Sequence, residues 1–433
     1  MDEPSPTIDP ASTRLGQLQR GRGAGHAMAR HGGTAAHDDI LHCLLVDPRV
    51  DRQTEQRARY LGELIVAVDL PLEPLLRSLG SATEAGLGHD ALAAAWALGH
   101  APTRALLGDP ATPEAVVAGI VACLHGERWA RLVEMPAHAR ALWLQLELPD
   151  ADSTASQRRV AAPTALAALS VHAVLELARG PESVRRDRLL GELCARGDAA
   201  TRAHLAAVVA DDLVLGRVRL AARALGLLGD ERLLPLAEDL FGRPDVFEDP
   251  TRRLPADLRM RRACLADYTR HLPAAIALPL ARAWHGRGDY FTTVAGTLFE
   301  LHATAADRAR LEAFVAANAP QGGITILDEL DALARLGDPA SVPLLCDVAA
   351  TATYSLARAR AITALTRMAH APAAQQVLRE ALWDCEDEAS ATACAFVIGP
   401  DAAAADRIRA LAASPLVDDE LAGRAQRSAA TRA

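Results

Sequence analysis

The arginines between positions 252 and 262 are the densest group of side chains able to bind a charged ligand. They are Arg252, Arg253, Arg259, Arg261 and Arg262. A guanidinium group donates in a planar fork that matches a carboxylate or a phosphate. Arg259 and Arg262 share a helix face, and the loop from Pro244 to Pro255 exceeds a normal hairpin turn. The pattern predicts a partner- or anion-binding surface. The alternative is neutralisation by the adjacent acids Asp245, Glu248 and Asp249.

A second basic motif, from Arg20 to Gly25, alternates arginine with small residues. A dinucleotide-binding loop needs a preceding strand, and the residues before Arg20 predict none. We therefore expect a flexible arm whose Arg20 and Arg22 are available to a phosphate or an acidic partner.

The remaining titratable residues predict no catalytic, metal or cofactor site. His26, His31, His37 and His42 are five or six residues apart, a spacing that fits no helical face. The chain contains no lysine, which excludes a Walker A loop and a Schiff-base lysine, and it has no Gly-x-Ser-x-Gly elbow. Residues 47–60 carry both charge signs, and the pair Glu55 and Arg59 predicts a solvated, salt-bridged helix face.

The composition favours helices and a reducing compartment. Half of the 433 residues are hydrophobic but only 3% are aromatic, so alanine and leucine must fill the core. The five scattered tryptophans are expected to pack in that core. A net charge of −9 disfavours broad coating of nucleic acid or an anionic membrane. Seven cysteines without a Cys-x-x-Cys pair, and an N-terminus without an apolar signal region, predict a cytoplasmic protein.

Three Leu-Gly-Asp runs indicate how the helices are connected. They are centred on Gly108, Gly229 and Gly337. Leucine can close a buried helix face, glycine suits the left-handed C′ position, and aspartate can cap the next helix. Their intervals fit units of about 36 to 40 residues, typical of stacked helical hairpins. The sequence therefore predicts an all-α superhelix, an α-solenoid of about twenty helices.

Composition shifts divide the chain into expected segments. Residues 1–35 are expected to form a flexible leader and residues 36–150 an N-terminal helical block. The polar residues 151–162 are expected to link this block to a repeat solenoid over 163–430.

The stretch Ala332–Leu345, followed by Ala357–Leu365, closely resembles a bacterial HEAT repeat of the phycobilisome-lyase type. Residues 223–236 resemble a second, weaker copy. The resemblance implies an irregular HEAT-like solenoid but little chemistry, because such repeats occur in scaffolds, lyases, DNA glycosylases and hydroxylases. The hydroxylases hold iron with repeated His-Glu pairs, and the chain has no His-Glu dipeptide.

These observations favour a non-enzymatic scaffold that binds a protein or peptide. One alternative is a nucleic-acid-binding or DNA-glycosylase-like HEAT protein. Another is a lyase-type HEAT protein acting on a protein-bound small molecule. The Arg-rich run contains no interleaved aromatic residue, which weakens the nucleic-acid alternative.

Overall fold

The chain divides into two compact units. Unit 1 combines Met1–Asp152 with Ala309–Ala433, and unit 2 is Ser153–Arg308. The computed structural model of the chain describes residues 8–52, 54–80, 86–124, 166, 169–179, 183–244, 253–321, 323–397 and 401–432. The expected linker, 151–162, lies outside these ranges.

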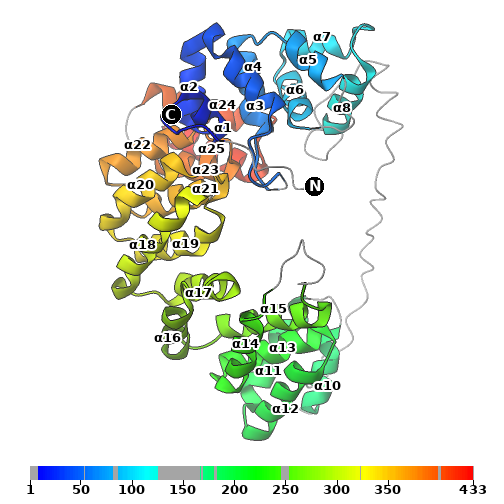
Figure 1. The fold of residues 1–433 in the computed structure, drawn as a ribbon, viewed down its shortest axis with the longest axis vertical. Helices are drawn as coiled ribbons and strands as arrows, with labels where there is room; N and C mark the ends of the chain where they lie inside the picture. The colour runs from blue at the N-terminus through cyan, green and yellow to red at the C-terminus, as the bar shows by residue number, and fades with distance from the viewer. Residues whose placement is uncertain are drawn as a thin grey trace. The chain divides into compact units, whose positions relative to one another are not determined.

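Unit 1 is built from helices at both ends of the chain (Figure 1). Its first set is α1 (Arg14–Gln19), α2 (Gly23–Gly32), α3 (His37–Leu45), α4 (Ala58–Val68), α5 (Glu73–Leu79), α6 (Leu87–Ala97), α7 (Ala101–Leu106) and α8 (Glu114–Leu124). Its second set is α18 (Arg308–Asn318), α19 (Leu327–Leu336), α20 (Val342–Thr351), α21 (Ser355–Thr366), α22 (Pro372–Ala381), α23 (Asp387–Phe396), α24 (Ala402–Ala413) and α25 (Asp419–Arg432).

Unit 2 is also helical. It contains α10 (Val171–Glu176), α11 (Ser183–Arg196), α12 (Ala199–Asp211), α13 (Leu215–Leu227), α14 (Leu234–Phe241), α15 (Ala256–Arg270), α16 (Ala274–Trp284) and α17 (Asp289–His302). Trp284 is fully buried there against Phe241 and Phe291, as expected of a core tryptophan.

The helices pack in the manner of stacked hairpins. In unit 2, α11, α13, α15 and α17 contact one another in that order, and in unit 1 the same holds for α19, α21, α23 and α25. Alternate helices thus form a row, while the helices between them close each hairpin. The described ranges contain no strand. The predicted all-α, solenoid-like fold is confirmed.

Two of the three predicted Leu-Gly-Asp turns have the expected geometry. Gly229 and Gly337 adopt left-handed φ values of 62° and 64°. Asp230 and Asp338 then accept backbone N–H groups of the next helical turn. Gly108 differs, because its φ is not positive. The two Arg-Gly-Asp sequences at 196–198 and 287–289 are helix-hairpin turns, as their positions between α11 and α12 and between α16 and α17 show.

The expected flexible leader is ordered from residue 8 onward and forms α1, α2 and a 3-10 turn. Its glycines permit close helix contact rather than flexibility. A Cβ atom on Gly16 would lie 2.2 Å from the carbonyl oxygen of Pro10, and one on Gly25 would lie 2.8 Å from the backbone of Gln17. The helices that follow residue 308, expected to continue a single solenoid over 163–430, instead pack with the N-terminal helices in unit 1.

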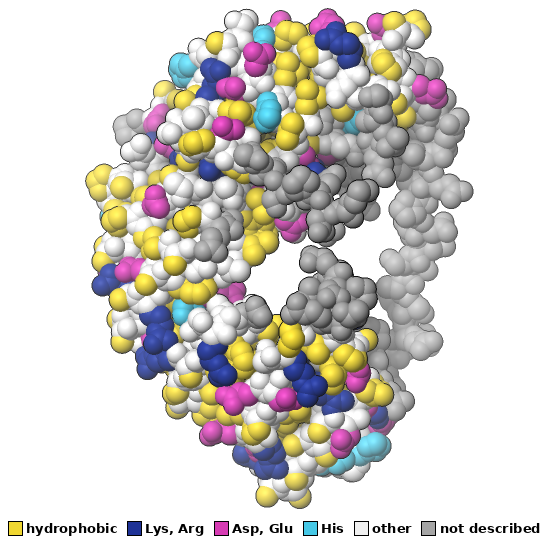
Figure 2. Space-filling model, in the orientation of Figure 1, with side chains coloured by type: hydrophobic (Ala, Val, Ile, Leu, Met, Phe, Trp, Pro, Cys, Tyr) yellow, Lys and Arg dark blue, Asp and Glu magenta, His cyan; other side chains and the backbone are white. Residues whose placement is uncertain are grey.

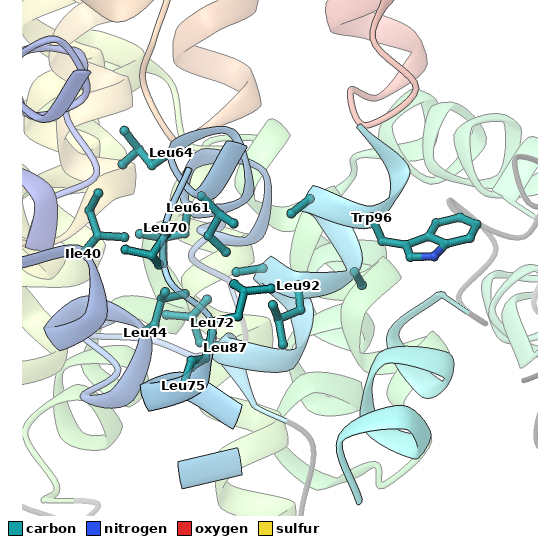
Figure 3. Packing of buried hydrophobic residues seen from close by; sticks show 14 of the residues in the cluster. Ile40, Leu44, Leu61, Leu64, Leu70, Leu72, Leu75, Leu87, Leu92 and Trp96 are labelled. Atoms are coloured by element: carbon teal, nitrogen blue, oxygen red, sulfur yellow. The ribbon is translucent and has the colours of Figure 1, made fainter. Parts of the chain in front are cut away.

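A leucine-rich core holds the N-terminal helices of unit 1 together. Figure 3 shows Ile40, Leu61, Leu75 and Leu92 converging from α3, α4, α5 and α6. Each of these four side chains is no more than 1% exposed.

On the protein surface, arginine and acidic side chains are interspersed over the face drawn in Figure 2. Among the described helices, none has the length and apolar character needed to cross a bilayer.

Candidate functional site

Arg261 and Arg262, two members of the predicted arginine surface, point into unit 2. They are 8% and 9% exposed. Arg261 Nη1 donates to the carbonyl oxygen of Val209 at 3.0 Å. Arg262 Nη1 donates to the carbonyl oxygen of Arg243 at 3.4 Å, and its guanidinium carbon lies 4.3 Å from the centre of the Tyr290 ring. Both arginines therefore fasten α15 to its neighbours instead of facing a ligand.

Two other arginines of the run are more accessible than Arg261 and Arg262. Arg253 is exposed and Arg259 is half-buried on α15. Arg252 lies outside the described residues, as do Asp245, Glu248 and Asp249. Neutralisation of the run by these acids therefore stays a prediction.

Replacing Arg262 by alanine is expected to lower the stability of unit 2 by about 1–2 kcal/mol, because a largely desolvated cation–π contact and a partly buried hydrogen bond are lost. Arg259→Ala on the same helix is the control, with an expected change within about 0.5 kcal/mol. Thermal denaturation followed by circular dichroism measures both. Equal melting temperatures for the two variants would show that the Tyr290 contact contributes nothing.

Arg20 and Arg22, expected on a flexible arm, are both engaged inside unit 1. Arg20 is 6% exposed, and its Nε donates to the carbonyl oxygen of Thr351 at 3.0 Å. Arg22 Nη2 lies 2.9 Å from Glu380 Oε2. These contacts attach the α1–α2 corner to the ends of α20 and α22.

Behind this attachment lies a cluster of buried charges that we call the ionic network. Arg358 binds both carboxylate oxygens of Asp384, at 2.7 and 2.9 Å. Arg57 lies between two carboxylates, 3.3 Å from Glu55 Oε1 and 3.6 Å from Glu386 Oε1. All five residues of the network are at most 3% exposed: Glu55, Arg57, Arg358, Asp384 and Glu386. The network therefore connects the segment just before α4 with the segment just before α23.

Cys385 lies at the centre of the ionic network. Its Sγ accepts a hydrogen bond from Arg57 Nη1 at 2.6 Å, and its N–H donates to the carbonyl oxygen of Gly21 at 2.9 Å. Gly21 has a φ of 66°, and a Cβ atom there would lie 2.5 Å from Cys385 Sγ. Burial raises the pKa of the Cys385 thiol well above its usual value. The thiol therefore fills space and accepts hydrogen bonds, and it is not an activated nucleophile.

Two of the three carboxyls of the network, those of Asp384 and Glu386, respond differently to burial. Burial by itself would raise the pKa of Asp384, but the attraction of Arg358 and their hydrogen bonds outweigh it, so the pKa lies below its usual value. Burial prevails at Glu386 and raises its pKa despite Arg57. As the pH falls, Glu386 is therefore protonated before Asp384.

The charged run 47–60 is not the solvated helix face that its pattern predicts. Helix α4 begins only at Ala58, and Glu55 accepts the backbone N–H of Ser355 at 2.8 Å. Arg59 pairs with Glu63 at 3.3 Å and with Asp387 at 3.1 Å. Arg57 and Arg59 thus meet Glu386 and Asp387 from the far end of the sequence, whereas Asp47, Arg49 and Arg52 pair within the run.

A cleft opens beside the ionic network, with a volume of about 780 Å³. We call it the binding cleft. Its lining comprises five acidic residues, two arginines, four threonines and a few apolar or amide side chains: Glu386, Asp387, Glu388, Asp418, Glu420, Arg367, Arg424, Thr54, Thr363, Thr366, Thr392, Phe396, Leu356, Ala391 and Gln56. These residues come from the loop before α4 and from α21, α23 and α25.

Glu388 and Glu420 are exposed charged residues of the binding-cleft lining. The Glu388 and Glu420 side chains are 47% and 69% exposed. Glu388 lies 3.6 Å from Arg360, and Glu420 lies 2.6 Å from Arg424 one helical turn away. Exposed pairs of this kind contribute about 0–1 kcal/mol, so a partner's cations can replace them. Phe396, 42% exposed, adds an apolar contact surface.

His26 and Glu63 form a pair of titratable side chains, with Nε2 of His26 3.7 Å from Oε2 of Glu63. Burial lowers the pKa of His26 to about 3; Glu63 opposes this shift, whereas Arg407, Arg30 and Arg59 add to it. Burial would raise the pKa of Glu63, but Arg407, Arg59 and His26 lower it to about 2. At neutral pH the histidine is therefore uncharged and the glutamate is ionised.

This pair predicts a loss of stability in mild acid. Between pH 6.5 and about 3 the unfolded chain binds a proton at His26 that the folded chain does not, so stability falls as the pH falls. From pH 6.5 to 5 the loss at this position is about 2 kcal/mol. Glu63 adds to the loss only below its ordinary pKa of 4.5. Urea denaturation at pH 7.5, 6.0 and 5.0 should show a shallower dependence for His26→Phe than for the wild type, and identical dependences would contradict the assignment.

Sequence reasoning did not single out Asp384–Asp387 or Arg358. The available signal was the acidic run around Cys385, four charged residues flanking a cysteine between apolar helices. A matching run with Arg57 and Arg59 lies more than 300 positions earlier, and nothing in the sequence alone pairs the two.

Among the residues that the structure describes, no three His, Cys, Asp or Glu side chains come together as metal ligands would. The geometry defines an all-helical, solenoid-like protein with an acidic cleft supported by buried ion pairs. No protein-family model matches the chain, and no curated protein matches its sequence.

Proposed function

We propose that the chain is a non-enzymatic binding module that holds a basic segment of a partner protein in the binding cleft. The observation that supports this proposal is a cleft of about 780 Å³ whose lining includes three exposed carboxylates, those of Glu388, Asp418 and Glu420. Threonine hydroxyls and Phe396 add hydrogen-bonding and apolar contacts. An arginine- or lysine-bearing peptide complements this lining.

The ionic network holds part of the cleft lining in a fixed geometry. Glu386 and Asp387 line the cleft and are at the same time held by Arg57 and Arg59. A surface held in its binding geometry loses little conformational entropy when the partner docks. This arrangement favours recognition rather than turnover, because the buried groups are already used in ion pairs.

The proposed HEAT-like relationship and cytoplasmic location agree with this role. Stacked helical hairpins present extended surfaces suited to peptide segments. All seven cysteines are unpaired, which supports a reducing compartment. The nucleic-acid alternative has less support, because phosphate groups would meet the acidic cleft and because Arg261 and Arg262 are buried.

Fluorescence polarisation with two labelled dodecapeptides tests the proposal. One alternates arginine and lysine with apolar residues, and the other carries glutamate in place of every basic residue. The full chain should bind the basic peptide and not the acidic one. The double variant Glu388→Arg/Glu420→Arg should weaken binding at least about tenfold.

The matched control is Asp239→Arg in unit 2, since Asp239 pairs with Arg243 one helical turn away at 2.6 Å, as Glu420 does with Arg424. Its affinity for the basic peptide should equal that of the wild type. Equal binding of both peptides, an equal loss in the control, or tighter binding of duplex DNA than of the basic peptide would overturn the proposal.

A further inference from the structure

Two adjoining cavities in unit 1 form a groove that we call the His26 pocket. Their volumes are about 680 and 410 Å³, and they share His26, Arg30, Trp383 and Ala403 as lining residues. The groove runs between α2, α4 and α24. It shares no lining residue with the binding cleft.

The walls of the His26 pocket are mostly apolar. Val66, Leu98, Ala410 and Pro415 line the larger cavity. The half-buried indole of Trp383 borders both cavities, and the guanidinium carbon of Arg407 lies 6.0 Å from the centre of its ring. Flat aromatic and guanidinium surfaces of this kind stack on aromatic rings. The walls therefore suit a flat, apolar ring system.

The most buried polar residue in the lining of the groove is His26. It is 3% exposed, and its Nε2 has no hydrogen-bond partner among the described residues. Glu63 Oε2, at 3.7 Å, is too distant for a hydrogen bond. Because a buried polar atom without a partner is costly, this nitrogen points to a ligand atom that completes it.

Glu63 determines which ligand atom fits beside His26. An ionised carboxylate at 3.7 Å favours the tautomer with the proton on Nε2, since a lone pair there would face negative charge. A hydroxyl group can accept from Nε2–H and donate to Glu63 Oε2 at once. Arg407 already binds Glu63 at 2.9 Å and holds the carboxylate in place.

The rim of the groove supplies a positive charge. Arg30 is exposed and lies four residues after His26 on the same face of α2. The structure records no carboxylate partner for Arg30 among the described residues. Asp406, the acidic residue of the opposite rim, is paired with Arg409. Arg30 is therefore positioned to bind an anionic group at the mouth of the pocket.

We infer that the His26 pocket binds a hydroxylated aromatic carboxylate, with its ring system between the apolar walls, its hydroxyl between His26 and Glu63, and its carboxylate at Arg30. This inference is independent of the proposed peptide-binding function, because the two sites have separate linings. The pocket volumes fall within the usual range for small-molecule sites.

Three fluorescent probes test the inference on the full chain. 6-Hydroxy-2-naphthoate carries both polar groups, 2-naphthoate lacks the hydroxyl, and 2-naphthol lacks the carboxylate. Titrations should show saturable binding of 6-hydroxy-2-naphthoate, with each of the other two about tenfold weaker.

Two variants assign the polar contacts. His26→Phe retains an aromatic ring beside Tyr60, whose ring centre lies 5.6 Å away, and removes the unpartnered nitrogen, so the fold should persist. It should weaken 6-hydroxy-2-naphthoate about tenfold and leave 2-naphthoate unchanged. Arg30→Ala should weaken both carboxylates and leave 2-naphthol unchanged.

Arg427→Ala, an exposed change on α25 outside both linings, is the control and should bind all three probes as the wild type does. Absence of saturable binding by 6-hydroxy-2-naphthoate would overturn the inference. So would a His26→Phe variant that binds this probe as tightly as the wild type, or one that loses 2-naphthoate to the same extent.

Discussion

Replacing Arg358 by alanine is expected to lower the stability of unit 1 by about 3–5 kcal/mol. Arg358 is 1% exposed and binds both oxygens of Asp384, itself 2% exposed. The variant leaves this carboxylate buried without its main counter-charge, and the cost of an uncompensated buried charge exceeds that of the lost contacts. Urea denaturation measures the loss, and hydrogen-exchange mass spectrometry should locate it in peptides from α21 and α23.

The neighbouring Arg360 provides the control. It lies on the same helix, 3.7 Å from Asp331 and 3.6 Å from Glu388, but its side chain is 42% exposed. Arg360→Ala should change stability by less than about 1 kcal/mol. The double variant Arg358→Met/Asp384→Asn should recover part of the loss, because it removes both charges while keeping the acceptor for the Glu386 N–H. Similar losses for Arg358→Ala and Arg360→Ala would contradict the importance of the ionic network.

Gly23→Ala is expected to destabilise unit 1 by about 3 kcal/mol, although alanine is the better helix former by about 1 kcal/mol. A Cβ atom at position 23 would lie 1.9 Å from the carbonyl oxygen of Glu380. Since that oxygen belongs to backbone, α2 must move away from α22. The movement weakens the Arg22–Glu380 pair and the hydrogen bond from Tyr60 to the Arg22 carbonyl.

Gly191→Ala is expected to change stability in the opposite direction. Gly191 lies within α11 of unit 2, and a Cβ atom there would meet nothing within 4 Å. This variant should stabilise unit 2 by about 0.5–1 kcal/mol. Urea denaturation compares the two, and limited proteolysis of residues 14–32 should accelerate only in Gly23→Ala. If both glycine variants are stabilised, α2 does not depend on close contact with α22.

The sequence predicts the local structure of this protein better than its long-range pairing. Gly229 and Gly337 end helices as their neighbours indicate, because a left-handed residue and a capping aspartate act within a few positions. At Gly108 the same Leu-Gly-Asp sequence does not form the left-handed turn, because Pro110 and a longer connection place the start of the next helix at Glu114. The local sequence therefore predicts where helices occur, but their exact first and last residues also depend on the surrounding structure.

The candidate site was beyond prediction for a different reason. Arg57 and Cys385 contact each other across 328 sequence positions, and each lies in a run that by itself looks solvated. Arginine between glycines likewise indicates flexibility, but in the structure Gly21 makes room for the Cys385 side chain and Gly23 for the carbonyl oxygen of Glu380. Burial converts these charged segments into internal contacts, and burial is a property of the folded unit rather than of either segment.

The interleaving of the two units along the chain has a consequence for synthesis. Unit 2, residues 153–308, is made in full before the ribosome reaches the partners of Arg57 and Arg59. At about 5–20 residues per second, the N-terminal helices wait roughly 15–60 s for Asp384–Asp387. During that interval their arginines stay hydrated and the surfaces of α2 and α4 stay open to chaperones. Nascent unit 2 can meanwhile fold before unit 1 is complete.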